Sequence, residues 1–453
     1  MEELTVMIVD SSARAHALSD AYERSPNVKR IIVSPGNDFI GYNRGKEVII
    51  APGKLTDPQS FLAVAQQYKP DLVDVCQDDA LAVGTVDLLK ENGFDVFGPT
   101  RDAARLEWDK AWARGFMKRH GIPHPQYLVF TNQQDGIDFV AKSYETGQAS
   151  FFIKAAGLCA GKGAIPANSL EEALKAIETM KSFGKAGEVY LIEECMTGEE
   201  ASVYAILNGN GTDFNVTKPA QDHKRLNNND EGPNTGGMGA VAPAGLVASN
   251  NYLEAAIKRQ VIVAAINGLQ DEHIPYTGIL YCGIMAVERN GELVPKVVEF
   301  NSRWGAPEAE VVVPGILTPM DEIAFACVNS EFLMDFQEDD KTRVCVVGAS
   351  RGYPGDYSAV KNKQIFGLED AMKMPGITVF GAGIKVADGK FYANGGRLFS
   401  LVAEGDNVKN AQSKALDAMR CVHMKGDTDF KFNLHYRTDI GRRDIERCAK
   451  GGE

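Results

Sequence analysis

The chain reads Gln221-Asp222-His223-Lys224-Arg225 and then, after a short polar interval, Gly232-Pro233-Asn234-Thr235-Gly236-Gly237-Met238-Gly239-Ala240. The first segment groups basic side chains, and the second is rich in glycine. Cations beside a flexible backbone with many free amide groups are what a polyanion such as a nucleotide triphosphate requires. Taken alone, a solvated, turn-rich loop is a slightly better interpretation. The choice therefore depends on the rest of the chain.

The length and net charge of the chain limit the folds and binding partners that are possible. At 453 residues the chain is too long for one hydrophobic core and predicts three or four packed units. The formal charge of −13 argues against a nucleic-acid surface, because a phosphate backbone demands a basic face. No apolar run approaches the roughly 20 residues of a membrane span. We therefore expect small-molecule substrates, with neither nucleic acid nor a membrane as a partner.

Scattered cysteines and the absence of familiar catalytic patterns narrow the chemistry. The eight cysteines form no CxxC pair and lack the spacing of zinc ligands. Mostly buried thiols in a reduced, cytoplasmic enzyme explain them best. The sequence shows no Ser-His-Asp arrangement and no plausible pair of catalytic carboxylates. His223 could act as an acid or a base, although solvent-exposed loop histidines are common.

The first hundred residues alternate between strands and helices. We predict strands at residues 4–9, 30–33, 47–50, 72–76 and 95–97, with helices clearest at residues 61–68 and 80–92. This alternation is typical of a doubly wound parallel sheet with helices on both faces. Ligands of such sheets bind at the carboxyl ends of the strands. The loops that follow the strands therefore supply candidate substrate ligands in Arg14, His16 and Asp78.

The rest of the chain divides into an α+β middle and an α+β end. Gly98-Pro99-Thr100 marks the first boundary, and a helix that carries Leu106 and Phe116 follows it and ends at Gly121. A small unit at about residues 123–190 contains a helix that a capping box begins at Ser169. We predict largely antiparallel strands at residues 190–194, 202–207, 213–217, 281–287 and 293–300, and a separate unit from residue 331.

A glycine-rich loop, Gly157-Leu158-Cys159-Ala160-Gly161-Lys162-Gly163, joins two predicted strands of the small unit. Its spacing is one residue short of a P-loop. We interpret Gly161, Lys162 and Gly163 as part of a flap that covers phosphates with backbone amides, although an ordinary hairpin is equally consistent. Lys154 on the preceding strand could clamp the phosphates, and Lys110 could reach them from the opposite side. Each could also be an ordinary surface lysine.

Glu299 and Asn301 are two residues apart on a predicted strand, so their side chains share one face. Carboxylate and amide oxygens beside phosphates suit Mg²⁺, and an exposed polar pair on an edge strand is the alternative. The acidic segment 193–200 could bind a ribose through a carboxylate and an adenine edge through its main chain, or be a surface turn. The candidate nucleotide contacts there are Glu193, Glu194, Met196 and Glu200.

Taken in order, these motifs resemble the ATP-grasp enzymes and, more narrowly, the phosphoribosylamine–glycine ligase family. The similarity runs nearly end to end and includes Gly352-Tyr353-Pro354, Gly395-Gly396-Arg397 and residues 436–441. It implies a multidomain α/β and α+β fold with a doubly wound N-terminal substrate-binding domain at residues 1–100. An ATP-grasp domain would follow at residues 101–330, with a flap subdomain at about 123–190, and a C-terminal α+β domain at 331–453.

The resemblance implies that ATP, glycine and 5-phosphoribosylamine give ADP, phosphate and glycinamide ribonucleotide in purine biosynthesis, through glycyl phosphate. By the family pattern, Lys110 and Lys154 hold the ATP phosphates, while Glu299 and Asn301 bind Mg²⁺ or Mn²⁺. Such chemistry needs positioning and neutralisation of charge. We expect developing charge to be stabilised by Arg303, Arg225 and Lys224. Further substrate contacts are expected at Asp222, Asn234, Thr235, Gly236 and Gly237.

The chain departs from the family pattern at several positions. It has Asp10-Ser11-Ser12-Ala13-Arg14-Ala15-His16 where the family has Gly-Ser-Gly-Gly-Arg-Glu-His, and Cys76-Gln77-Asp78 where the family has Gly-Pro-Glu. Ala156 and Ala306 replace two aspartates. Two alternatives therefore stay open: an ATP-grasp ligase for a different amine or acid, and a non-catalytic nucleotide-binding relative. We expect a monomer or a weak homodimer.

Overall fold

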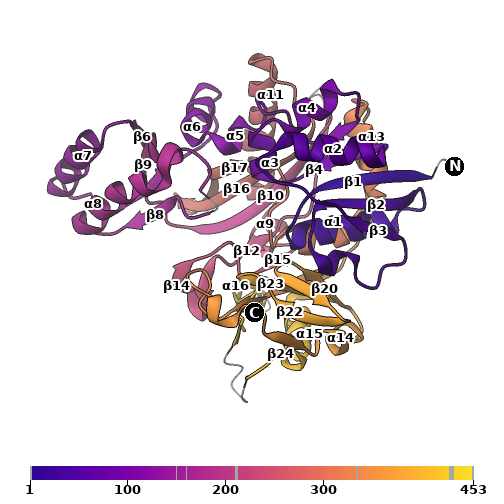
Figure 1. The fold of residues 1–453 in the computed structure, drawn as a ribbon. Coiled ribbons are helices and arrows are strands. Elements are labelled where there is room, and N and C mark those ends of the chain that lie inside the picture. Colours follow the sequence, from indigo (N-terminus) through magenta and orange to yellow (C-terminus); the bar gives the residue numbers. More distant parts are fainter. Residues whose placement is uncertain are drawn as a thin grey trace.

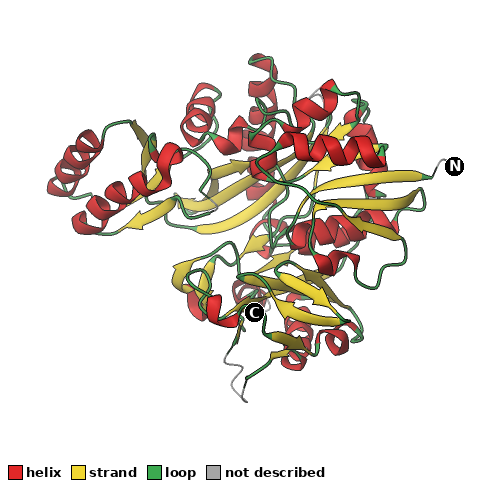
Figure 2. Ribbon diagram, viewed as in Figure 1, coloured by secondary structure: helices red, strands yellow, loops and turns green. Residues whose placement is uncertain are grey.

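The computed structural model describes residues 3–148, 150–159, 161–209, 213–332, 335–427 and 433–450. An N-terminal parallel sheet, a central antiparallel sheet and a C-terminal unit lie together, and a small flap projects away from them (Figure 1). Helices flank the sheets (Figure 2). In the described ranges, no helix has both the length and the apolar character to cross a membrane.

The N-terminal sheet is parallel, with the order β3-β2-β1-β4-β5. Its strands are β1 (Leu4–Asp10), β2 (Val28–Pro35), β3 (Glu47–Ile50), β4 (Leu72–Val75) and β5 (Val96–Phe97). Its helices are α1 (Ala13–Arg24), α2 (Pro58–Tyr68), α3 (Asp78–Ala82) and α4 (Thr85–Glu91), with a 3₁₀ turn η1 (Asp38–Gly41). Alternate residues of β1 enter separate cores, Val6 and Ile8 in one and Met7 and Val9 in the other. The predicted doubly wound sheet is confirmed.

One predicted helix of this domain is wrong. Residues 80–92 form two helices, α3 and α4, because Gly84 between them adopts a left-handed backbone with φ of 82°. A residue in that conformation ends a right-handed helix, and glycine adopts it without steric cost.

The flap is an antiparallel sheet with the order β6-β9-β7-β8. Its strands are β6 (Tyr127–Phe130), β7 (Phe151–Ala155), β8 (Ala164–Ala167) and β9 (Tyr190–Glu194), and its helices are α7 (Gln133–Glu145), α8 (Leu170–Thr179) and the 3₁₀ helix η2 (Met180–Gly187). Ser169 caps α8 by accepting a hydrogen bond from the Glu172 amide at 3.2 Å, which confirms the predicted start of this helix.

The central sheet is antiparallel and has the order β11-β10-β16-β17. Its strands are β10 (Glu199–Leu207), β11 (Phe214–Val216), β16 (Gly278–Arg289) and β17 (Glu292–Asn301). Against it pack α5 (Arg105–Trp108), α6 (Lys110–Arg119), α9 (Gly245–Ala248), α10 (Asn251–Ile257), the π-helix η4 (Lys258–Val263) and α11 (Ala264–Asp271). The predicted hairpin of β16 and β17 is confirmed.

The predicted single helix before Gly121 is wrong, because Asp109 divides it into α5 and α6. Asp109 has φ of −129° and ψ of 88°, which are not helical, and its carboxylate accepts a hydrogen bond from the Trp112 amide at 3.0 Å. This cap starts α6 at Lys110, whose amide donates to the Ala156 carbonyl of the flap at 2.9 Å.

The C-terminal unit contains a six-stranded sheet that begins with strands from the motif segment. Its path is β12 (Gln221–Asp222), β15 (Gly239–Ala242), β18 (Thr342–Ser350), β23 (Arg397–Gly405) and β20 (Ile377–Gly381), with β25 (Leu434–His435) beside β18. A second sheet comprises β21 (Ile384–Ala387), β22 (Lys390–Ala393), β19 (Gln364–Phe366) and β24 (His423–Met424). Its helices are α14 (Leu368–Met372), α15 (Val408–Cys421) and α16 (Arg442–Lys450). Two strands of this sheet, β12 and β15, therefore come from residues 221–242, which precede the predicted C-terminal domain at residues 331–453.

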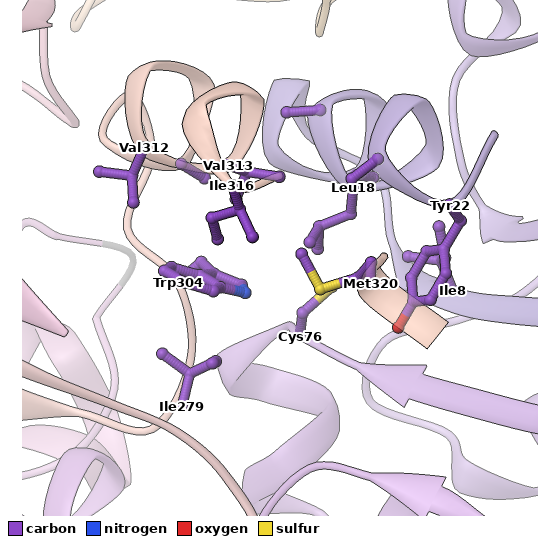
Figure 3. Close-up of a cluster of buried hydrophobic side chains, with 14 of the residues drawn as sticks. Ile8, Leu18, Tyr22, Cys76, Ile279, Trp304, Val312, Val313, Ile316 and Met320 are labelled. Carbon is purple, nitrogen blue, oxygen red and sulfur yellow. The ribbon is translucent and has the colours of Figure 1, made fainter. Parts of the chain in front are cut away.

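A shared core fixes the N-terminal domain to the end of β17. Figure 3 shows Leu18 and Tyr22 of α1 facing Trp304, with Met320 and Cys76 between them. The short helices α12 (Ala309–Val312), η5 (Val313–Gly315) and α13 (Met320–Val328) cover this cluster. Each large side chain buried here contributes about 1.5–3 kcal/mol. The loops after β1 and β4 are thus held close to residues 302–304.

Candidate active site

Glu299 of β17 lies at the centre of a group of cations. Burial raises the pKa of its carboxyl, but Lys224, Lys110, Lys154 and Arg303 outweigh burial and lower it. These four side chains come from the segment after β12, from α6, from β7 and from the turn after β17. The structure therefore brings together five of the side chains that the sequence predicts for ATP phosphates, metal and developing charge. We call Glu299 and these four cations the cationic cluster.

Arg303 connects the cationic cluster to the N-terminal domain. Its Nη2 lies 2.7 Å from Glu107 Oε1 and donates to Asn301 Oδ1 at 3.4 Å. Burial lowers the pKa of Arg303, but Glu107 and Asp78 together raise it above its ordinary value. Burial raises the pKa of Glu107 to about 7 against the attraction of Arg303. Asp78, predicted as a substrate ligand, thus faces the same arginine as Asn301.

Lys154 is held in place by a buried ion network. Its Nζ lies 2.7 Å from Glu193 Oε2. Arg114 of α6 donates to both Glu193 oxygens, at 2.6 and 3.0 Å, and to the Val298 carbonyl at 2.6 Å. Burial raises the pKa of Glu193, but Lys154 and Arg114 lower it to about 2. Glu193 therefore positions Lys154 in this structure, and its direct contact with a nucleotide stays a prediction.

The flap loop begins beside Lys110. The Lys110 amide donates to the Ala156 carbonyl at 2.9 Å, and its Nζ donates to the Gly157 carbonyl at 3.4 Å. Gly161 has φ of 75°, and a Cβ at Gly163 would lie 2.9 Å from the Cys159 sulfur. Both positions thus favour glycine. Ala160 of this loop lies outside the described residues.

The acidic segment from the end of β9 to the start of β10 lies next to the cationic cluster. Glu200 accepts from Lys224 Nζ at 2.6 Å, and its side chain is 42% exposed. Glu194 pairs with Lys296. Met196 is half-buried in the connecting loop. Glu200 is therefore placed between the cluster and solvent, while a nucleotide contact of any of these residues stays a prediction.

The glycine-rich segment is folded rather than loose, so the alternative of a solvated loop is wrong for residues 237–240, which are buried. Thr235 donates to the Lys224 carbonyl at 2.8 Å and accepts from the Gly237 amide at 3.0 Å. A Cβ at Gly237 would lie 2.3 Å from Pro307 and 2.7 Å from Asp222 Oδ1, and its φ is 103°. Only glycine fits there. Burial, with Glu308 adding to it, raises the pKa of Asp222 well above its ordinary value.

Residues of the C-terminal unit support this segment. Arg397 donates to the Gly236 carbonyl and, at 3.0 Å, to the Ala306 carbonyl. The Gly236 amide donates to Tyr353 Oη at 2.9 Å. Asn234 accepts from Arg225 at 3.4 Å across the hairpin of β13 (Arg225–Asn227) and β14 (Glu231–Asn234). Arg225 is thus placed on this hairpin.

A cavity of about 710 Å³ opens next to the segment. The flap loop lines one side, the hairpin a second and residues 351–355 a third. Lys162 and Asn234, both predicted as ligands, line it together with Tyr353. Tyr353 lines the cavity and also accepts the hydrogen bond from the Gly236 amide, so the cavity lies next to the glycine-rich segment. The cavity is wide enough for a small substrate.

Arg14 and His16 are both buried, at 4% and 5% exposure. His16 Nδ1 accepts from the Gly381 amide of β20 at 2.9 Å, and its Nε2 lies 3.2 Å from Arg44 Nη1. Burial lowers the pKa of His16 well below its ordinary value, so the ring is neutral. The structure thus shows His16 as a link between the N-terminal domain and the C-terminal sheet. Its contact with substrate stays a prediction.

His223 corrects the expectation of an exposed loop histidine, because its side chain is buried. Its Nε2 accepts from the Gly441 amide at 3.2 Å. Burial lowers its pKa to about 4. The charged groups that act on it are Arg437, Asp230, Asp439 and Arg443.

We expect His223 to make the fold acid-sensitive. Its pKa is about 4 in the folded state against 6.5 for a free histidine, so the unfolded chain binds a further proton below pH 6.5. Folding free energy that is fully present above pH 6.5 is therefore lost as the pH falls toward 4, by about 3 kcal/mol. Urea unfolding should show that His223→Gln flattens this slope between pH 6.5 and 4.5. The exposed His273 provides the control, since His273→Gln should leave the slope unchanged.

Four residues that contribute to the site were not predicted from the sequence: Glu107, Arg114, Tyr353 and Arg397. Charged residues within helical patterns are usually exposed, and so Glu107 and Arg114 gave no signal of their own. Arg397 belongs to Gly395-Gly396-Arg397, one of the motifs shared with the ligase family, but the motif alone does not indicate what the side chain contacts. Only Arg114 could have been found from the sequence. It lies four residues after Lys110 and hence on the same face of the predicted helix as that candidate phosphate ligand.

Glu299 and Asn301 fit a hard divalent cation. The carboxyl of Glu299 is ionised, because the cations lower its pKa. Asn301 is 6% exposed, and its Oδ1, the atom that can ligate a cation, accepts one long hydrogen bond from Arg303 at 3.4 Å, which leaves a lone pair free for an ion. Oxygen donors next to positive side chains suit an ion shared with phosphate oxygens.

Comparison with known proteins agrees with this geometry over nearly the whole chain. Residues 4–107, 108–309 and 343–443 match the N domain, the ATP-grasp (A) domain and the C domain of phosphoribosylglycinamide synthetase. The phosphoribosylamine–glycine ligase of Nostoc sp. (strain PCC 7120) is 38% identical and covers 97% of this chain and 99% of its own length. The chain is also 37% identical to the trifunctional purine biosynthetic protein adenosine-3 of Homo sapiens, of which it spans 42%.

Solved structures show the same relation. The crystal structure of phosphoribosylamine–glycine ligase from Thermotoga maritima has a TM-score of 0.76 at 26% identity, and covers 96% of this chain and all of its own. The biotin carboxylase domain of the Hydrogenobacter thermophilus 2-oxoglutarate carboxylase shares the fold, with a TM-score of 0.68 at 15% identity.

The fold and the cationic cluster beside the glycine-rich flap loop define an ATP-grasp protein. Within that class, the chain belongs to the phosphoribosylamine–glycine ligase family.

Proposed function

We propose that the protein is an ATP-dependent ligase that joins glycine to 5-phosphoribosylamine and yields glycinamide ribonucleotide, ADP and phosphate in purine biosynthesis. The convergence of Lys110, Lys154, Lys224 and Arg303 on Glu299 supports this proposal most strongly. Relatives of this name match the chain end to end. We also propose the cytoplasm as its location, since all eight cysteines are free thiols.

The reaction proceeds in two transfers. A glycine carboxylate oxygen attacks the γ-phosphorus of ATP, the bond to the bridging oxygen breaks, and ADP leaves. The amine of 5-phosphoribosylamine then attacks the acyl carbon of glycyl phosphate, phosphate leaves with the electron pair of the C–O bond, and the nitrogen loses a proton. Positioned cations stabilise the charge in both steps without a covalent nucleophile on the protein.

Each part of the site has a place in this scheme. Lys110 and Lys154 hold the ATP phosphates, and Gly161, Lys162 and Gly163 close over them. Lys224 and Arg303, which also lower the pKa of Glu299, would stabilise the charge that develops. Mg²⁺ or Mn²⁺ held by Glu299 and Asn301 would neutralise phosphate charge when bound. A closed flap excludes water, which would otherwise hydrolyse the acyl phosphate.

The remaining predicted contacts complete the proposal. Glu200 would bind the ribose of ATP, and the main chain at Met196 its adenine. The segment from Asn234 to Gly237 would hold glycine and the amine close to Asp222, while Arg225 of the hairpin would steady the phosphate that leaves.

ADP release measures the function directly. With ATP, magnesium and glycine, ADP should form only when 5-phosphoribosylamine is generated in place from ribose 5-phosphate and ammonia. Mass spectrometry should then detect glycinamide ribonucleotide. If ATP binds but no ADP forms with all three substrates, the proposal is wrong, and other amines and acids become the candidates.

A further inference from the structure

Asp10 and Arg14 lie at the edge of the N-terminal sheet where such sheets bind their ligands. The strand order β3-β2-β1-β4-β5 reverses between β1 and β4, and the crevice at that reversal, outside the carboxyl ends of the strands, is the usual ligand position. Asp10 ends β1, and α1 begins at Ala13. The amino end of a helix favours an anion there.

An internal anion already occupies this edge. The Asp10 carboxylate is 0% exposed and accepts five hydrogen bonds, one of them a long one from Cys76 Sγ at 4.0 Å. Its Oδ1 accepts from the amides of Ser11 at 2.6 Å and Ser12 at 3.1 Å. Its Oδ2 accepts from Ser12 Oγ at 2.9 Å and from Arg14 Nε at 2.7 Å. Backbone amides, a hydroxyl and a guanidinium are the donors that a ligand phosphate would use.

Each nitrogen of the Arg14 guanidinium also has a partner in the protein. Its Nη1 donates to the Trp304 carbonyl at 2.9 Å, and its Nη2 donates to Gln77 Oε1 at 2.5 Å. Gln77 belongs to the second loop at the same edge. Both loops that depart from the family pattern therefore join one network around Arg14, in which three of its five N–H donors already have protein partners and fewer are left for an external anion.

The surroundings add negative charge. Asp74 of β4 lies behind the network, where it accepts from Tyr22 Oη at 3.0 Å. Burial raises the pKa of Asp74 to about 7, and Asp10 contributes to that rise. A phosphate at this edge would thus meet a buried carboxylate and a second carboxyl near its ionisation point. The nearby cations, Arg14 and Arg303, are both already paired with carboxylates.

We infer that Asp10 is a built-in anion in the position of a ligand phosphate, so that the enzyme uses an unphosphorylated amine nearly as well as its phosphorylated counterpart. This inference rests on the proposed function and concerns the class of amine acceptor. Removal of the Asp10 charge leaves Arg14 and the amides to an external phosphate, and should create the preference that the wild-type protein lacks.

The test compares ribosylamine with 5-phosphoribosylamine, each generated in place from ammonia and the sugar. The ratio of their kcat/KM values should lie within about tenfold for the wild-type protein. In Asp10→Asn it should shift toward the phosphorylated amine on the order of 10- to 100-fold, the effect of a charge-assisted hydrogen bond. Asp20→Asn, the same change near the other end of α1, should not shift it. A wild-type preference well above tenfold overturns the inference, as does an unchanged ratio in folded Asp10→Asn.

A measurement of sugar binding tests the role of Asp10 even if the proposed ligase activity is wrong. If neither amine supports ADP formation, the proposed function fails, and calorimetry with ribose 5-phosphate and ribose still tests Asp10. Wild-type protein should bind the two sugars about equally, and Asp10→Asn should bind ribose 5-phosphate at least about tenfold more tightly. Tight binding of ribose 5-phosphate alone by the wild-type protein contradicts the inference. Asp10→Gly serves in the same comparison if Asp10→Asn does not fold.

Discussion

Glu299→Gln should lower kcat by about 10²–10³-fold, the cost of removing one preorganised electrostatic group from a reacting centre. Four cations surround this carboxylate and lower its pKa against the effect of burial. The amide keeps the shape of the side chain but removes the charge that those cations and a divalent ion require. The dependence of turnover on magnesium concentration should shift to higher concentrations at the same time.

Steady-state ADP release over a magnesium titration measures both effects. Glu292→Gln, the same change at the exposed start of β17, is the matched control and should leave kcat unchanged. Loss of the Glu299 charge also leaves Lys224, Lys110 and Lys154 to repel one another, so thermal unfolding must show that the variant is folded. Full turnover with unchanged magnesium dependence would remove Glu299 from the proposed metal site.

The parts of the fold that follow from the sequence are those with a regular pattern of apolar residues. Alternation in β1 places Val6 and Ile8 in one core and Met7 and Val9 in another, and this pattern predicts a sheet covered on both faces. The breaks at Gly84 and Asp109 were not predicted. A single glycine or aspartate within a helical pattern is compatible with a continuous helix, and local backbone geometry decides the outcome.

Burial of charge is the second feature that the sequence conceals. Arg114 and Glu193 are 79 residues apart in the chain, and each reads as a surface residue until the fold joins them. His223 reads as part of an exposed loop, whereas Gly441 near the end of the chain covers it. The two-residue strand β12 carries too short a pattern to reveal that it belongs to the C-terminal sheet. Four predicted cations, Lys110, Lys154, Lys224 and Arg303, nevertheless act on Glu299, because their motifs were identified by chemistry and not by periodicity.

Arg114→Met should destabilise the protein by about 3–5 kcal/mol, the cost of breaking a buried ion pair from one side. Arg114 pairs with both oxygens of Glu193 and also donates to carbonyls at the end of β17. Its loss leaves Glu193 buried with Lys154 as its remaining cation. Urea unfolding measures the change. Arg119→Met on the same helix is the control and should cost less than about 1 kcal/mol, because the Arg119–Glu272 pair is exposed.

Two further measurements separate lost charge balance from lost shape. Glu193→Gln added to Arg114→Met should restore part of the stability, because it removes the uncompensated charge; a purely steric defect would stay as it was. The pH dependence gives the same distinction. The pKa of Glu193 falls from 4.5 to about 2 on folding, so its contribution is present above pH 4.5 and is lost as the pH falls toward 2. The difference in stability between wild type and Arg114→Met should therefore narrow as the pH approaches 3. A difference that is the same at pH 3 and pH 7 would mean that Arg114 acts through packing rather than as the counter-ion that holds Glu193 and Lys154 in place.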